Sequence, residues 1–279
     1  MTVKIVTDSV ADLPPQVVKD LGITVIPVNV CFGDEVYRDG VDISTEEFYE
    51  KLAQSKVMPV TSVPALGVFA ETYDKLAEET DEILVIALSS KLSGVYEVAS
   101  QSVQFMKKKC RVEVMDSQWV IMAQGFIVMS AARAAQAGAS FDEVLEVVRR
   151  NISRVQLCSV FDTLEYLKRG GRIGKAAAFM GTMLHIHPVI GIKDGEVVPL
   201  GRTHSRAKAL DYLYNFAMSY SYIEEMSVAY VNAVDDAERL IERLSLKFPK
   251  ERVYRSRTSP VIGAHTGPNL LVLALLGDR

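Results

Sequence analysis

The feature that most constrains the fold is a regular alternation of short β-type and helical segments that starts at the N-terminus. Pro14 and Pro15 suit the first turn of a helix that ends at Gly22, and a β-type run stands on each side of it. The predicted strands of this half are residues 3–7, 23–30, 83–88 and 112–115. Such alternation predicts an α/β fold with a parallel sheet covered by helices.

Two helix starts carry a specific signature. Ser44 is followed three residues later by Glu47, and Ser140 by Glu143. This spacing predicts capping boxes, in which serine and glutamate satisfy free backbone N–H groups at the start of each helix.

The second half has a different pattern of predicted strands and helices. Lys193-Asp194-Gly195 lies between two β-type runs, 186–192 and 196–202, and predicts a tight hairpin. Further strands are predicted at 155–161, 226–231, 252–255, 261–264 and 270–275, with helices at 163–168 and from about Ser205. We expect a domain boundary near residues 152–158, between tightly packed domains, because no Gly/Ser-rich linker marks it.

Composition excludes several function classes. The formal net charge of −4 argues against a nucleic acid as the main partner. The three cysteines are widely spaced and show no zinc or redox pattern. No apolar run reaches the roughly 20 residues of a spanning helix, and the N-terminus lacks the layout of a signal peptide. We therefore expect a cytoplasmic protein.

Polar clusters follow the predicted strands at the edge where open parallel sheets bind ligands. They are Asp8-Ser9, Ser89-Ser90, Ser93-Gly94 and Asp116-Ser117. The stretch ALSSKLSGVY places Ser93 and Gly94 at a helix start, where free N–H groups and a hydroxyl can bind an anion. Capping of the helix by Ser93 is an equally good interpretation.

The stretch PVTSVPALGVF raises the same alternatives. Thr61 and Ser62 precede Pro64, so one of them is expected to cap the helix that follows. Capping explains one hydroxyl and does not require two, which leaves Thr61 as a candidate ligand-binding residue.

The histidines and arginines give weaker signals. None of the four histidines has metal-binding spacing, and His185 and His187 lie two apart in a strand-like run, so no metal site is predicted. His265 interrupts the apolar run VIGAHTGPNLLVLALL, where the glycines and proline are expected to break a strand. In KRGGRIG, Gly170-Gly171 suits a helix end and leaves Arg169 and Arg172 beside it for an anion or an acidic partner.

An enzymatic alternative rests on chain order. Ser93, Asp235 and His265 follow the order of an α/β-hydrolase triad, but Lys91 and Val95 stand where the G-x-S-x-G elbow needs glycine. The pattern therefore disfavours a serine hydrolase.

Taken together, these motifs resemble the DegV family, bacterial fatty-acid-binding proteins that include the acyl-carrying subunit of fatty acid kinase. The resemblance runs almost from end to end. It rests on the stretches IVTDSVADLP, PVTS, LSSKLSGVY, VMDSQWVIMAQG, LEYLKRGGRIG, RTHSRAKAL and IGAHTGP, in this order.

The resemblance implies a two-domain α/β fold, with an N-terminal parallel sheet in residues 1–155 and a mixed sheet in residues 156–279. One long-chain fatty acid, similar to palmitate or oleate, would lie in a tunnel between the domains. By the family's motifs, Thr61 and Ser93 match the residues that grip the acyl carboxylate, and His265 lies near it. Ser62 and Gly94 are neighbours of this site.

The resemblance also implies a non-catalytic protein that needs no cofactor or metal. In kinase-coupled members, an ATP-dependent kinase subunit phosphorylates the bound acid to an acyl phosphate, and His265 is a candidate to assist that transfer. Arg169, Arg172 and Arg202 are candidates for docking this subunit, and transient contact with a membrane surface is a further expectation. The alternatives are a serine hydrolase acting on acyl esters and a binder of a small anionic metabolite.

This chain departs from the family pattern at several positions. Val63 and Ala65 stand where glutamine and serine are common, Asn269 where glycine is frequent, and His187 where lysine is usual. These changes leave Thr61, Ser93 and His265 in place. Hydroxyls and helix-start N–H groups are expected to keep the carboxylate ionised without a buried lysine or arginine.

Overall fold

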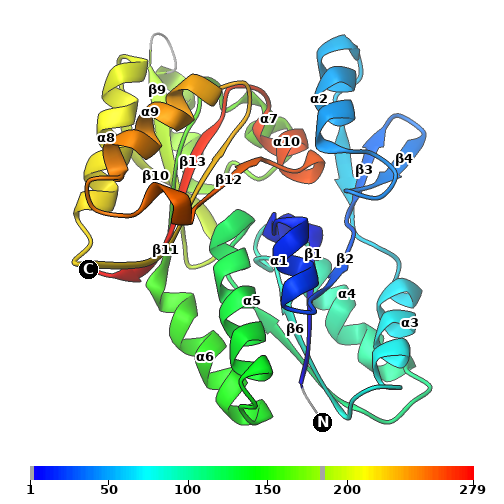
Figure 1. Cartoon of the computed structure of the whole chain (residues 1–279). Helices are drawn as coiled ribbons and strands as arrows, with labels where there is room; N and C mark the ends of the chain where they lie inside the picture. The colour runs from blue at the N-terminus through cyan, green and yellow to red at the C-terminus, as the bar shows by residue number, and fades with distance from the viewer. Residues whose placement is uncertain (1–2, 183–185) are drawn as a thin grey trace.

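The computed structural model describes residues 3–182 and 186–279, which form the predicted α/β fold (Figure 1). A four-stranded parallel sheet has the order β2-β1-β6-β7. Its strands are β1 (Lys4–Asp8), β2 (Thr24–Ile26), β6 (Glu82–Ala87) and β7 (Arg111–Asp116). Because all four run in the same direction, Asp8, Ser89 and Asp116 meet at one edge of the sheet, as the sequence predicts.

Helices cover this sheet on both sides of β6 (Figure 1). They are α1 (Pro15–Asp20), α3 (Leu66–Leu76), α4 (Val95–Ser102), α5 (Ile121–Gln136) and α6 (Phe141–Arg154). Helix α5 packs on β1 and β6, and α4 packs on β6 and β7. The capping box of Ser140 and Glu143 is confirmed at the start of α6.

A small antiparallel sheet, β4-β3-β5, stands beside the parallel one. It consists of β3 (Asn29–Phe32), β4 (Glu35–Arg38) and β5 (Val60–Ser62). Helix α2 (Thr45–Gln54) lies between β4 and β5 in the chain, and its predicted capping box at Ser44 is confirmed. The prediction of one continuous strand over residues 23–30 is therefore wrong. Pro27, which lacks an N–H for a sheet ladder, separates β2 from β3 and lets them join different sheets.

The second half forms a six-stranded mixed sheet with the order β10-β9-β8-β13-β11-β12. Its strands are β8 (Val155–Val160), β9 (His187–Lys193), β10 (Glu196–Thr203), β11 (Tyr222–Tyr230), β12 (Val253–Arg257) and β13 (Leu271–Asp278). Only the β11–β12 pair among these neighbours is parallel within the described ranges. The predicted hairpin is confirmed: Asp194 and Gly195 have φ values of 53° and 81°, which a tight turn between β9 and β10 requires.

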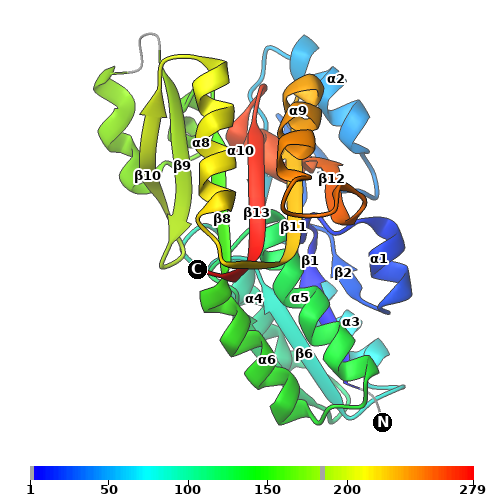
Figure 2. The same cartoon turned by 60° about the vertical axis from the view of Figure 1, so that its left-hand side comes forward.

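The helices of the second half pack in two pairs (Figure 1 and Figure 2). Helices α8 (Arg206–Met218) and α9 (Val234–Leu244) pack against each other and against the sheet. The short helices α7 (Glu165–Arg169) and α10 (Pro260–Thr266) pack together toward the first half of the chain. Single 3-10 segments cover Ser9–Ala11, Val103–Phe105, Gly174–Thr182 and Lys250–Arg252.

One of two apolar cores of the described chain runs through both halves, whereas the other, which includes Leu213, Leu240 and Leu273, lies within the second half. The shared core includes Ile5 and Phe126 from the first half and Leu164, Val272 and Leu276 from the second. The mixed sheet begins at Val155, beside the predicted division into residues 1–155 and 156–279, but the shared core is continuous across that point. The division into two domains accordingly stays a prediction.

The predicted strand at residues 261–264 is wrong, because this segment is the helix α10. Pro260 occupies its first turn, and Gly267, at a φ of 69°, ends it. A short apolar run fits a buried strand or a buried helix equally well, so its pattern could not separate the two.

Candidate functional site

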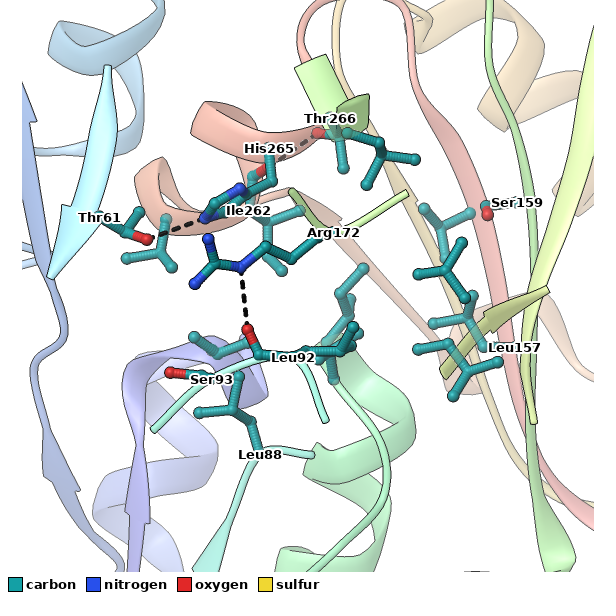
Figure 3. Close-up of a pocket in the computed structure, with 18 of the residues that line it drawn as sticks. Thr61, Leu88, Leu92, Ser93, Leu157, Ser159, Arg172, Ile262, His265 and Thr266 are labelled. Carbon is teal, nitrogen blue, oxygen red and sulfur yellow. Dashed lines mark hydrogen bonds between the residues drawn. The ribbon is translucent and has the colours of Figure 1, made fainter. Parts of the chain in front are cut away.

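Thr61 and His265, 204 residues apart in the chain, are in direct contact. The Thr61 Oγ1 atom lies 2.8 Å from His265 Nε2 (Figure 3). Thr61 comes from β5, and His265 from the last turn of α10. The expectation that Thr61 or Ser62 caps the next helix is wrong, since α3 has Ala65 at its N-cap and no side-chain cap bond.

The His265 ring is neutral at physiological pH. Burial, together with the nearby charge of Arg172, lowers its pKa to about 4. Its Nδ1 atom is buried and has no hydrogen-bond partner among the described residues. The ring therefore keeps one unpaired polar atom, while its other nitrogen, Nε2, contacts Thr61.

Glycines allow α10 to approach α7 closely around this ring. A Cβ atom on Gly170 would lie 2.4 Å from His265 Nδ1, and one on Gly267 would lie 2.3 Å from Cδ2 of Tyr166. Gly170 therefore does more than end α7: because it has no side chain, the His265 ring can pack against its backbone.

Ser93 lies in the loop between β6 and α4 and faces the same space. Helix α4 begins at Val95, with Gly94 as its N-cap and no side-chain cap bond. The capping interpretation of Ser93 is therefore wrong. In the part of the chain that the structure describes, the Ser93 hydroxyl forms no hydrogen bond, so it is available to a ligand.

Arg172 bridges the two groups. Its Nε donates to the Leu92 carbonyl at 3.0 Å, and its Nη1 donates to the Gly170 carbonyl at 2.6 Å. These bonds hold the guanidinium between Ser93 and His265 (Figure 3). The half-buried Arg172 therefore lies on the wall of this site, and the expectation that the carboxylate needs no buried lysine or arginine stays a prediction.

A cavity begins at these side chains and continues between the parallel and the mixed sheets. Its polar end contains Thr61, Ser62, Ser93, Arg172 and His265. The remaining wall is aliphatic or aromatic apart from two hydroxyl residues and Gly191, and its side chains include Val10, Leu88, Ile121, Leu157, Phe161, Ile190, Ile262 and Val272.

The two hydroxyls on the apolar wall are already satisfied. Ser159 Oγ donates to the Ile190 carbonyl at 2.9 Å, and Thr266 Oγ1 donates to the Ile262 carbonyl at 2.9 Å. The interior therefore offers hydrocarbon surface, while free polar atoms gather at one end. This arrangement suits an amphipathic ligand with a small anionic head.

The other predicted site residues lie outside the cavity wall. Gly94 is exposed beside Val63, and Arg202 is exposed on β10. Arg169 is also exposed, and its Nε pairs with Glu165 at 2.6 Å. Of the three predicted docking arginines, only Arg172 lines the cavity.

The geometry of a hydrolase triad is not assembled. Asp235 lies in the first turn of α9, and the Nδ1 atom of His265 has no carboxylate partner among the described residues. No hydrogen bond joins Ser93 to His265 within residues 3–182 and 186–279. A base without an orienting group and without contact to the nucleophile lacks the features of such a triad.

The described residues contain neither a metal-binding cluster nor a membrane-spanning helix. No group of three histidine, cysteine, aspartate or glutamate side chains there could hold a metal ion. His187 instead contacts Asp162 through Nδ1 at 2.9 Å, whereas His185 lies outside the described residues. None of the helices there is long and apolar enough to cross a membrane.

Comparisons with known proteins agree with one another. Residues 2–277 match the family model described as "Uncharacterised protein, DegV family". A DegV domain-containing protein from Clostridium perfringens is 33% identical over 273 residues, which cover 96% of each chain. A DegV family protein of Thermus thermophilus, solved in a study of its fatty acid binding, has a TM-score of 0.91 and 32% identity, covering 99% of this chain and 100% of its own. A stearic acid-binding protein from Eubacterium ventriosum has a TM-score of 0.89 and 26% identity, covering 99% and 98%.

Proposed function

The chain belongs to the DegV family, and from this premise we propose that it binds one long-chain fatty acid in the cavity between its sheets. The observation that carries the proposal is the distribution of polarity along the cavity wall. Hydroxyl, imidazole and guanidinium groups lie at one end, and the rest of the wall is mainly hydrocarbon. Solved relatives described as fatty-acid-binding proteins support the same ligand class.

At the polar end, the acyl carboxylate accepts hydrogen bonds from Thr61 and Ser93. The neutral His265 ring donates its Nε2–H to Thr61 Oγ1, which leaves the Thr61 proton for the carboxylate, and Arg172 adds a positive charge that keeps the acid ionised. A small anion would use the same groups but would leave the apolar wall uncovered. The long apolar wall therefore favours a fatty acid over the small anionic metabolite.

Along the apolar wall, the acyl chain gains about 0.8 kcal/mol for each CH₂ group that it buries. Palmitate and oleate contain many CH₂ groups, so burial of the acyl chain supplies most of the binding free energy. The carboxylate end then fixes orientation, with the head group near the surface and the tail inside.

We further propose that the protein is a non-catalytic carrier that presents the carboxylate to an ATP-dependent kinase subunit. Arg169 and Arg202 are exposed and remain candidates for docking that subunit, whereas Arg172 is assigned to the ligand end. His265 is placed beside the bound head group, where it can assist phosphoryl transfer. We expect the protein to be cytoplasmic and to take up its fatty acid during transient contact with a membrane surface.

Mass spectrometry of the purified protein tests the binding proposal. The native mass should exceed the denatured mass by that of one long-chain fatty acid. After delipidation, the protein should take up oleate but not inorganic phosphate. Failure to retain or take up any long-chain acid would refute the proposal, and turnover of acyl esters that depends on Ser93 would favour the hydrolase instead.

The kinase step has its own test. With a cognate kinase, His265→Ala should lower acyl-phosphate formation at saturating oleate, while exposed Arg169→Ala should raise the kinase concentration needed for half-maximal rate. Unchanged rates in both variants would contradict these assignments without affecting the binding proposal.

A further inference from the structure

Helix α10 carries His265 but is not capped by its own residues. Its N-cap residue Ser259 makes no side-chain cap bond, and the Ser259 Oγ atom is buried without a partner among the described residues. The helix has only seven residues, too few to be stable without help from tertiary contacts. Something else must hold its N-terminus.

Two carboxyl groups from the first half of the chain do so. The Asp39 carboxyl faces the backbone N–H of Val261, in the first turn of α10, and accepts the Ser9 hydroxyl at 2.8 Å. Asp12 accepts the backbone N–H of Ser259 at 3.4 Å. Asp39 is only 4% exposed, so its contact with α10 is shielded from water.

A second contact fixes the middle of α10. A Cβ atom on Gly263 would lie 2.5 Å from Phe48 and 2.6 Å from the Tyr49 hydroxyl, so the helix backbone rests directly on these rings of α2. The Tyr49 hydroxyl also bonds Thr258 Oγ1 at 2.8 Å, just before the helix. These contacts fix the start and the middle of α10. They therefore also fix its last turn, where His265 contacts Thr61.

We propose that Asp12 and Asp39 are positioning residues of the carboxylate site: by holding the N-terminus of α10 from the other half of the chain, they keep His265 against Thr61. The consequence for fatty-acid affinity rests on the function proposed above, whereas the position of the histidine does not.

Several other charged and titratable groups face these two carboxyls. Asp8 lies beside them and accepts the Leu88 N–H at 2.8 Å. Arg257 lies 4.8 Å from the centre of the Tyr49 ring and 3.7 Å from Glu46, and Arg255 pairs with Glu238 at 3.3 Å. No cation is therefore paired directly with Asp12 or Asp39 in the described chain.

This environment affects protonation but does not abolish the contact. Burial raises the pKa of Asp39 to about 7, with a further contribution from Asp8, and burial raises that of Asp12 to about 8. A protonated carboxyl group still accepts through its carbonyl oxygen, so either form can receive a helix N–H. An asparagine, which keeps one such oxygen, should therefore replace the aspartate, whereas an alanine should not.

The test compares Asp39→Ala with Asp39→Asn by NMR titration of the His265 ring in ligand-free protein. In the wild-type protein the ring should titrate near pH 4. In Asp39→Ala its pKa should rise by about one unit or more toward the free value of about 6.5, because α10 is released and the ring gains solvent. In Asp39→Asn it should stay within roughly half a unit of the wild type.

Oleate titration of the same proteins supplies the second readout. We expect a dissociation constant raised at least about tenfold in Asp39→Ala and by less than about threefold in Asp39→Asn, since only the former loses the acceptor. Asp74→Ala is the matched control, because Asp74 accepts the backbone N–H groups of Lys107 and Lys108 at the surface. It should change neither readout.

An unmoved His265 pKa in folded Asp39→Ala would overturn the proposal. If that variant does not fold, Asp12→Ala removes a single longer bond and should shift the His265 pKa in the same direction; no shift would again overturn it. If wild-type protein binds no oleate, the proposed function fails, while the NMR titration still decides the positioning role.

Discussion

The Ser93→Ala substitution tests the carboxylate end of the cavity with little disturbance to the fold. The Ser93 hydroxyl forms no hydrogen bond within the described residues, and Gly94, not Ser93, is the N-cap of α4. Removing one half-buried oxygen therefore leaves the protein's own bonds intact. We expect the free energy of unfolding to change by no more than about 0.5 kcal/mol.

The effect on affinity should be much larger. A hydrogen bond to a charged group contributes about 1.5–3 kcal/mol, and each 1.4 kcal/mol is about a tenfold change in dissociation constant. Loss of the Ser93 donor should accordingly weaken oleate binding by about 10- to 100-fold. The remaining donor Thr61 and the charge of Arg172 prevent complete loss.

Calorimetric titration of delipidated protein measures this effect with two ligands. Oleate carries the charge, whereas methyl oleate has the same tail and an uncharged head, so the difference between wild type and variant should shrink to about 1 kcal/mol or less. Ser100→Ala is the matched control: its hydroxyl donates to the Tyr96 carbonyl at 2.8 Å inside α4. This control should bind oleate as the wild type does.

Oleate affinity within twofold of wild type in Ser93→Ala would refute the assignment of Ser93 to the carboxylate. An equal loss for oleate and methyl oleate would also refute it, because the lost contact would then not involve the charge. A large fall in unfolding free energy would show that the hydroxyl has a structural partner after all.

Three further predictions follow from the same geometry. Gly263→Ala should destabilise the protein by about 1–3 kcal/mol in chemical unfolding and weaken oleate binding, because the new methyl group collides with Phe48 and Tyr49; wild-type values for both would contradict the packing of α10. Bound oleate should raise the His265 pKa from about 4, since the carboxylate favours the charged ring. An unchanged NMR titration would show that the carboxylate does not bind beside His265. Because the folded-state pKa of Asp39 is raised to about 7, the folded chain binds this proton more tightly than the unfolded chain. Unfolding free energy should therefore fall as pH rises from about 4 to about 7, and the slope should lessen in Asp39→Asn; an identical slope would show that Asp39 does not titrate there.

Much of the fold follows from local sequence. The alternation of strands and helices predicts the parallel sheet, and the polar residues after its strands lie at one edge as expected. The capping boxes at Ser44 and Ser140 and the turn at Asp194-Gly195 also form as predicted. Each of these features depends on interactions between residues near one another in the chain, so the sequence contains the whole signal.

The candidate site shows where that signal ends. The motifs of the family single out Thr61, Ser93 and His265, but their local patterns predicted helix caps and a strand break. Only the tertiary fold decides that Thr61 lies on β5, that α10 is a helix, and that Arg172 enters the cavity. The contact between Thr61 and His265 spans 204 residues, and the bond from the Ser259 N–H to Asp12 spans 247. This seven-residue apolar segment forms a helix because carboxyl groups and aromatic rings from the other half of the chain pack against it. The sequence of the segment alone does not specify those partners.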